Sequence, residues 1–175
     1  QFGEIRALCH GKHGTFAGFW HAGGLRGQRT GRSRDLGSWG LVMIWHADVL
    51  FEGEAQGEVL RFDAPISFWG GVDPVTSEVT LAGHPQRGLR IADKMLVIPQ
   101  LIGSSSSSAV MLELFYTRMA PKALILGGRD AILPVGVVVA RQMDWPTIPV
   151  VVLPDPTFQT GETISIARNG QIMKA

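Results

Sequence analysis

The sequence predicts an α/β fold with a core of parallel strands joined by crossover helices, and with antiparallel strands added from both ends of the folded segment. Short apolar runs alternate with longer helical patterns between residues 95 and 153, which implies parallel pairing with right-handed crossovers. Short alternating segments precede this part. An Asn-Gly pair stands between two alternating runs near the C-terminus, which is a strong hairpin signal.

The first expected elements are strands and turns. Residues 58–63, within "GEVLRFD", alternate in polarity and predict a strand. In "ISFWGGVDPVTSEVTL" we expect a strand, a turn at Asp73-Pro74, and a second strand over residues 78–81. The run "KMLVIP" predicts a short buried strand that ends at Pro99.

Two helices are expected next, each followed by a strand. "AVMLELFYTRM" is long enough for three helical turns, mostly buried, with Ser107 or Ser108 as the N-cap. "KALILGG" then predicts a strand. "RDAILPVGVVVARQ" predicts a helix with Asp130 as N-cap, although its valines leave a strand as the competing interpretation. "TIPVVVLPD" is the next strand, and "TISIARNGQIMK" is the hairpin.

Composition divides the chain near residue 47. Residues 1–47 hold 10 of the 22 glycines and carry 6 Lys and Arg against 2 Asp and Glu. They show neither helical nor strand periodicity, so we expect a Gly/Arg-rich extension, poorly ordered, with a basic patch for an acidic partner as the alternative. Residues 48–175 are expected to form one folded domain, since 175 residues suit a single core.

Charge and cysteine content narrow the function classes. The net charge of +1 does not favour nucleic acid as a partner, and the apolar runs are far shorter than the roughly 18 residues of a membrane span. Cys9 is the single cysteine, and the first residues lack the pattern of a secretory signal. Both observations fit a reducing, cytoplasmic compartment.

Five consecutive serines, residues 104–108, follow Gly103 between a buried strand and a buried helix. A flexible spacer is unexpected there, because the two flanking elements must pack together. Backbone N–H groups at a helix start attract anions, and the hydroxyls add donors, so a small carboxylate or phosphate site is one interpretation. A capped turn with spare hydroxyls is the other.

Three further groups of residues are candidates for a site. Cys9, His10 and His13 stand close together, but the pattern lacks a fourth metal ligand. His84 lies in a polar turn before a proline and is expected to be structural rather than substrate-binding. In "FWGGVDP", Gly70, Gly71 and Asp73 form either a tight turn or a loop that faces a substrate or partner.

Three segments together resemble the swivel domain, or small subunit, of the aconitase X family. They are "ISFWGGVDPVTSEV" at 66–79, "HPQRGLRIADKMLVIPQLIGSSSSSAVMLEL" at 84–114 and "APKALILGGRDAIL" at 120–133. The family includes phosphomevalonate dehydratase small subunits and the C-terminal parts of cis-3-hydroxyproline dehydratases. The resemblance covers roughly residues 48–170, in which the order of all elements is kept.

The resemblance implies a swivelling β/β/α fold and a hydro-lyase whose active site lies between this domain and a large iron–sulfur subunit. It implies that Ser104 is the proton-abstracting base, and that Ser105, Ser106 and Gly103 help to bind the substrate carboxylate. Gly70, Gly71 and Asp73 are then expected to shape the cleft or contact the partner. Where family members often have Gly, Thr or Val in this loop, this chain has serine throughout.

The same resemblance defines the expected cofactor and partner. Iron–sulfur clusters need about three or four thiolates, and this chain has one cysteine, so we expect no cofactor on this chain and the cluster on the large subunit of a heterodimer. The chain alone should be inactive. The substrate is expected to be a small hydroxy acid such as mevalonate 5-phosphate or cis-3-hydroxy-L-proline. The alternative is a non-catalytic module that binds a small anion.

Overall fold

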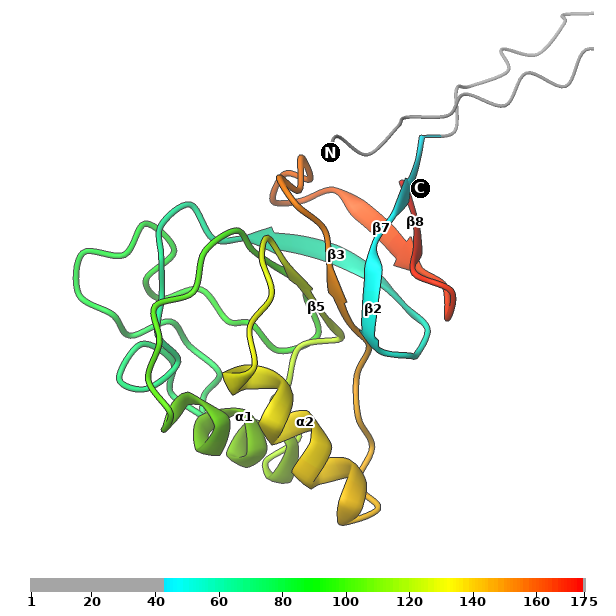
Figure 1. Cartoon of the computed structure of the whole chain (residues 1–175). Coiled ribbons are helices and arrows are strands. Elements are labelled where there is room, and N and C mark those ends of the chain that lie inside the picture. The colour runs from blue at the N-terminus through cyan, green and yellow to red at the C-terminus, as the bar shows by residue number, and fades with distance from the viewer. Residues whose placement is uncertain (1–42, 175) are drawn as a thin grey trace, which may run out of the picture. The chain divides into compact units, whose positions relative to one another are not determined.

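The computed structural model of the protein describes residues 43–174, which fold into eight strands and two helices (Figure 1). The predicted α/β class is confirmed. The strands are β1 (Ile44–His46), β2 (Asp48–Phe51), β3 (Ala55–Arg61), β4 (Met95–Ile98), β5 (Ala123–Leu126), β6 (Val150–Val152), β7 (Thr163–Ile166) and β8 (Gln171–Lys174). The helices are α1 (Ser107–Tyr116) and α2 (Ile132–Gln142).

The strands form one mixed sheet in the order β1-β8-β7-β3-β4-β5-β6-β2. Strands β3, β4, β5 and β6 are parallel to their neighbours within this group. All other pairings are antiparallel. The expected parallel core with antiparallel strands from both ends is therefore present. Strands β1 and β2 lie at opposite ends of this order although only Ala47 separates them in sequence, so the sheet must curve until its two edges meet.

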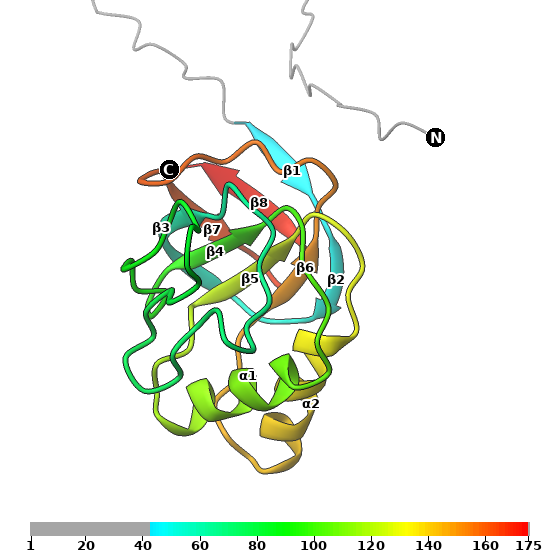
Figure 2. The same ribbon diagram turned by 90° about the vertical axis from the view of Figure 1, so that its left-hand side faces the viewer.

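Both helices cover the same face of the parallel strands (Figure 2). Helix α1 connects β4 to β5, and α2 connects β5 to β6. The helices pack closely because Gly136 of α2 has no side chain: a Cβ built there would lie 2.6 Å from the carbonyl oxygen of Ser108. The valine-rich segment is thus helical, and the strand interpretation of it is wrong. The side chains of Val135, Val138 and Val139 are exposed on the outer face of this helix, so these valines are not the buried residues of a strand.

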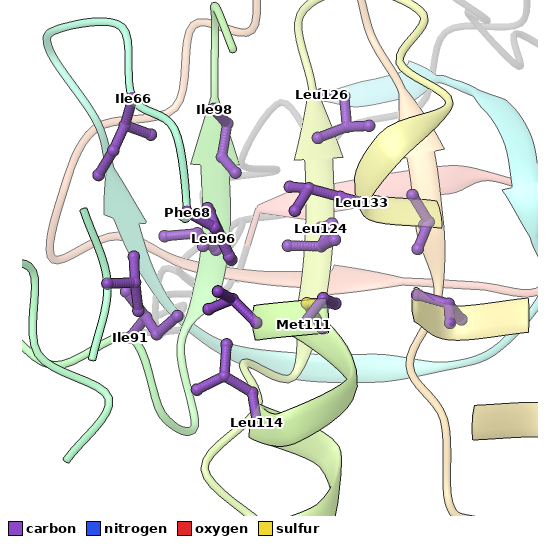
Figure 3. Packing of buried hydrophobic residues seen from close by; sticks show 14 of the residues in the cluster. Ile66, Phe68, Ile91, Leu96, Ile98, Met111, Leu114, Leu124, Leu126 and Leu133 are labelled. Atoms are coloured by element: carbon purple, nitrogen blue, oxygen red, sulfur yellow. The ribbon is translucent and has the colours of Figure 1, made fainter. Parts of the chain in front are cut away.

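The core has two parts, one on each face of the parallel strands. The part beneath the helices joins alternate residues of β4 and β5 to the inner faces of α1 and α2 (Figure 3). The part on the opposite face joins the other residues of those strands to β7 and β8. Strands β4, β5 and β6 are buried along their whole length, which is why their sequences are continuous apolar runs.

The segment between β3 and β4 differs from the prediction. The strands expected near Ile66 and over residues 78–81 are reduced to isolated bridges, Ile66–Leu101, Val72–Val79 and Glu78–Arg90. Ser77 has a φ of 60°, which regular strands do not tolerate. The segment is a compact loop stabilised by its own turns.

The predicted C-terminal hairpin is confirmed, but its turn is not the type that an Asn-Gly pair usually forms. Strands β7 and β8 pair antiparallel, and the N–H of Gly170 donates to the carbonyl of Ala167 at 2.9 Å. Only Gly170 of the Asn-Gly pair has a positive φ, of 80°, so the loop is not the two-residue turn in which both central residues have positive φ.

Residues 1–42 lie outside the described residues, and so do Cys9, His10 and His13. The division at residue 47 remains a prediction. Strand β1, although it lies within the segment 1–47, belongs to the sheet through its pairing with β8. Neither helix within residues 43–174 is long and apolar enough to cross a membrane.

Candidate functional site

The serine run lies where the chain leaves the carboxyl end of β4 and enters α1. Two backbone contacts hold the residues just before the run against the loop that follows β3. Leu101 bridges Ile66 in parallel, and the N–H of Ile102 donates to the carbonyl of Ile66 at 2.9 Å. The loop that contains Gly70 and Gly71 therefore starts beside the segment that leads into the serines. In a parallel sheet the carboxyl end of the strands is the usual place for a ligand site.

The last two serines of the run are engaged in the fold. Ser107 is 3% exposed, and its Oγ accepts a hydrogen bond from the N–H of Trp69 at 3.2 Å and lies 3.1 Å from the Oγ of Ser67. Ser108 donates its hydroxyl to the carbonyl of Ser105 at 2.8 Å. The expectation that Ser107 or Ser108 caps α1 is wrong. Both are helical residues, and the hydroxyl of Ser107 instead ties α1 to the glycine loop.

The first three serines remain available to a ligand. Ser106 occupies the N-cap position without a side-chain cap bond. The N–H groups of residues 107, 108 and 109 donate to the carbonyls of residues 104, 105 and 106, so the donors at the start of the helix itself are already used. By contrast, the N–H groups and hydroxyls of Ser104, Ser105 and Ser106 donate to no residue within 43–174. The free donors are thus those of Ser104, Ser105 and Ser106, just before the first helical residue.

The two glycines of the neighbouring loop are required by geometry. Gly70 has a φ of 73°, a conformation that favours glycine. A Cβ built on Gly71 would overlap the carbonyl oxygen of Ser67. Between these constraints the chain makes a tight turn that leaves Trp69 63% exposed beside the serine run. That Gly70 and Gly71 shape the cleft or contact the partner stays a prediction.

The carboxylate of Asp73 serves its own turn. It accepts hydrogen bonds from the N–H of Val75 at 2.8 Å and from the N–H of Thr76 at 3.2 Å. These bonds lower the pKa of Asp73, because they favour the ionised carboxylate. The structure thus gives Asp73 a structural task, and its contact with a partner stays a prediction.

Ser104 borders a shallow hollow between the starts of the two helices. Gly103, Ser107 and Asp130 also line this hollow, whose volume of about 10 Å³ is too small to enclose a substrate. The carboxylate of Asp130 accepts hydrogen bonds from the N–H groups of Ile132 at 3.1 Å and of Leu133 at 2.9 Å, which confirms that this side chain caps α2. The residue at the geometric N-cap position is the next one, Ala131. No pattern along the sequence indicated that this carboxylate lies next to the serines.

His84 is a buried structural residue, as expected. It is 6% exposed, and its Nδ1 accepts the N–H of Gln86 at 3.2 Å, which requires the tautomer whose Nε2–H donates to the carbonyl of Ala64. Gln86 in turn holds Asp63 through two hydrogen bonds, of 2.5 and 3.1 Å. The "HPQ" segment therefore fixes the position of the chain just beyond β3.

One feature was missed at the sequence level. A cavity of about 370 Å³ opens at the carboxyl ends of β3 to β6, and Arg61 is the positively charged residue in its wall. In the sequence Arg61 is one alternating residue of a strand, and no spacing signal distinguishes it. Within residues 43–174, no three His, Cys, Asp or Glu side chains are grouped to hold a metal ion, so these residues do not fit an iron–sulfur cluster.

Comparison with known proteins gives consistent results. The family described as the aconitase X swivel domain matches residues 44–175. The cis-3-hydroxy-L-proline dehydratase of Hypocrea jecorina is 41% identical over 131 residues, which are 69% of this chain and 22% of that protein. The phosphomevalonate dehydratase small subunit of Thermococcus kodakarensis is 43% identical over 88 residues, which are 50% of this chain and 66% of that subunit.

Solved structures agree on the fold. The crystal structure of Thermococcus kodakaraensis aconitase X in its holo-form matches with a TM-score of 0.69 and 33% identity, over 75% of this chain and 98% of that chain. The chain spans only about a fifth of the length of the two cis-3-hydroxy-L-proline dehydratases it matches. Most of what those dehydratases contain thus has no counterpart here.

Proposed function

The chain belongs to the aconitase X swivel family, and from that premise we propose that it supplies the serine base of a dehydratase, in a site completed by a larger partner. The name of the small-subunit relatives supports a larger partner subunit, and the proposal is that the two form a heterodimer. The reaction removes water from a small hydroxy acid. Mevalonate 5-phosphate and cis-3-hydroxy-L-proline are the two substrates that the relatives' names indicate.

The proposal is carried by the unequal roles of the five serines. Ser107 and Ser108 have bonded hydroxyls, whereas Ser104, Ser105 and Ser106 keep their hydroxyls and N–H groups free of other residues in the described part of the chain. Three consecutive unsatisfied N–H groups before a helix form a site for an oxyanion. A fold that needed only a capped turn would use the hydroxyls for the cap.

Ser104 takes the proton in this proposal. A base removes the proton from the carbon beside the substrate carboxylate, its electron pair forms the carbon–carbon double bond, and hydroxide leaves from the neighbouring carbon. A serine hydroxyl is a weak base unless its alkoxide is stabilised. The N–H groups of Ser105 and Ser106, together with the positive end of α1, lie beside Ser104 and supply that stabilisation. Ser105 and Ser106 also hold the substrate carboxylate.

A partner is needed for two physical reasons. The hollow beside Ser104 holds about 10 Å³, so a second surface must enclose the substrate and exclude water. Departure of hydroxide also needs an electrophile, and the residues described here do not fit a metal centre. We expect an iron–sulfur cluster on the large subunit to have this role.

The test is turnover by the chain co-expressed with its large subunit, with both candidate substrates assayed. Ser104→Ala should lower turnover by about 10²-fold to 10⁴-fold, because the proton acceptor is lost. Assembly, followed by size-exclusion chromatography, should not change. Ser108→Ala is the matched control, since it removes a hydroxyl from the same run that bonds within the fold and is not the proposed proton acceptor. Near-normal turnover by Ser104→Ala would remove the base assignment.

A further inference from the structure

The cavity at Arg61 is separate from the hollow beside Ser104. The two share no lining residue, although both lie where the parallel strands end. Its volume of about 370 Å³ lies within the range of roughly 300 to 1,000 Å³ that is usual for small-molecule pockets. Its walls come from the ends of β3, β4 and β5 and from the segment after β6, and they include Arg61, Pro99, Gly127, Asp155, Pro156 and Thr157.

The guanidinium of Arg61 is held in a fixed place. Its Nη1 donates to the carbonyl of Pro156, and its Nε lies 3.8 Å from the carboxylate of Asp63. Asp63 is itself held by two hydrogen bonds with Gln86. The side chain of Arg61 is 23% exposed, so this cation is ordered before any ligand arrives. A preorganised guanidinium pairs well with a carboxylate through two parallel hydrogen bonds.

The second charge in the cavity is the carboxylate of Asp155. This residue is exposed, has a φ of 49°, and forms no ion pair with any residue in the described range. The carbonyl of its neighbour Pro156 accepts a hydrogen bond from the guanidinium of Arg61, and Asp155 and Arg61 both line the cavity. With Asp63 also beside Arg61, the carboxylates near the cavity outnumber the guanidinium. A doubly charged phosphate is therefore disfavoured, and a ligand that carries both a carboxylate and an ammonium is matched.

We propose that this cavity, the Arg61 pocket, binds a small zwitterionic amino acid. The ligand carboxylate pairs with Arg61, its ammonium pairs with Asp155, and its aliphatic part packs on Pro99 and Pro156. The hydroxyl of Thr157 adds a hydrogen-bonding group to the wall. The proposal does not depend on Ser104 or on a partner, so its failure would leave the proposed dehydratase function unchanged.

The test is a titration of the full chain followed by ¹H–¹⁵N NMR, with L-proline as the amino acid probe. Two compounds of the same ring size remove one charge each: cyclopentanecarboxylate lacks the ammonium and pyrrolidine lacks the carboxylate. We expect saturable shifts with L-proline at the amides of Gly127 and Thr157 and at Nε of Arg61. Each single-charge compound, and inorganic phosphate, should bind at least about tenfold more weakly. Equal binding of cyclopentanecarboxylate, tighter binding of phosphate, or no saturable shift with L-proline would overturn the proposal.

Two variants assign the charges. Arg61→Met and Asp155→Asn should each weaken L-proline binding about tenfold. Arg168→Gln is the matched control, because Arg168 lies in the β7–β8 turn and pairs with the exposed Glu54 at 3.5 Å. Asp155 is exposed, so Asp155→Asn should fold normally even if Arg61→Met does not. Unchanged affinity in Asp155→Asn, with a native-like spectrum, would refute the two-charge site.

Discussion

Helices α1 and α2 each follow a buried parallel strand, but the backbone N–H groups at their N-termini are satisfied in different ways. At α2 the carboxylate of Asp130 accepts the first two helical N–H groups, at 3.1 and 2.9 Å. At α1 no side chain caps the helix, although five serines are within reach in sequence. Ser107 turns its hydroxyl to the neighbouring loop instead, and Ser104 to Ser106 keep theirs free of other described residues.

The difference supports the proposal that the start of α1 is left for a ligand, whereas the start of α2 is capped by the fold itself. Serine and aspartate are both good caps, so the uncapped start of α1 is not explained by residue type. An exposed N–H group can bind water at little cost, and it can bind an oxyanion with more gain. Four predictions test or sharpen this comparison.

The largest expected effect concerns the contact that holds the two helix starts side by side. Gly136→Ala places a Cβ 2.6 Å from the carbonyl of Ser108 and 2.9 Å from the Cβ of Met111. We expect the free energy of unfolding to fall by about 2 kcal/mol or more, as measured by urea denaturation. Gly128→Ala is the control, because no atom lies within 4 Å of the added Cβ. Equal stability of the two variants would contradict the close packing of α1 on α2.

The next prediction compares the contributions of two serines of the run to the stability of the fold. Ser107→Ala removes the hydrogen bonds that its buried hydroxyl makes with the N–H of Trp69 and with the hydroxyl of Ser67, and should lower the free energy of unfolding by about 2 kcal/mol, about 1 for each bond. Ser106→Ala, at the N-cap position, should change it by less than about 0.5 kcal/mol because its hydroxyl has no partner in the described chain. If Ser106→Ala proved the more damaging of the two, the hydroxyl of Ser106 would be a cap after all. Chemical denaturation of both variants decides this.

A smaller effect is expected at the start of α2. Asp130→Ala removes the cap and should lower the free energy of unfolding by about 1 kcal/mol. Asp130→Asn should retain most of the stability, since an amide oxygen can still accept both N–H groups. The thermal midpoints of the two variants, compared with the unaltered chain, provide the measurement. A full loss in Asp130→Asn would mean that charge, rather than capping, is what α2 needs.

The smallest effect depends on pH and concerns Asp73, another carboxylate that caps backbone N–H groups. Hydrogen bonds from Val75 and Thr76 lower its pKa in the folded protein. Its contribution to stability is therefore present above the ordinary pKa of an aspartate and is lost as the pH falls through the folded-state value. Asp73→Asn should reduce the acid-side loss of stability, as measured by denaturation at neutral and acidic pH. An identical pH profile would show that these bonds do not favour the ionised form.

Much of the fold was predictable because strong local patterns agreed with the final packing. The runs that form β4 and β5 are apolar throughout, which fits strands buried on both faces. Asp130 was found as a cap because capping is a local property of a few adjacent residues. The segment between β3 and β4 was not predictable in the same way. Its apparent strands alternate correctly, but Ser77 adopts a positive φ that only the folded loop imposes.

The sequence by itself determined the two helices, the parallel core strands, the C-terminal hairpin, the family and the serine run as the candidate site. These depend on periodicity, on turn residues and on motifs that are read along the chain. Only the tertiary structure decided which serines are free, because Ser107 is bound by a loop 38 residues away in sequence. It also decided that Arg61 and Asp155 line one cavity, since these charges lie on segments that meet only when parallel strands align their carboxyl ends.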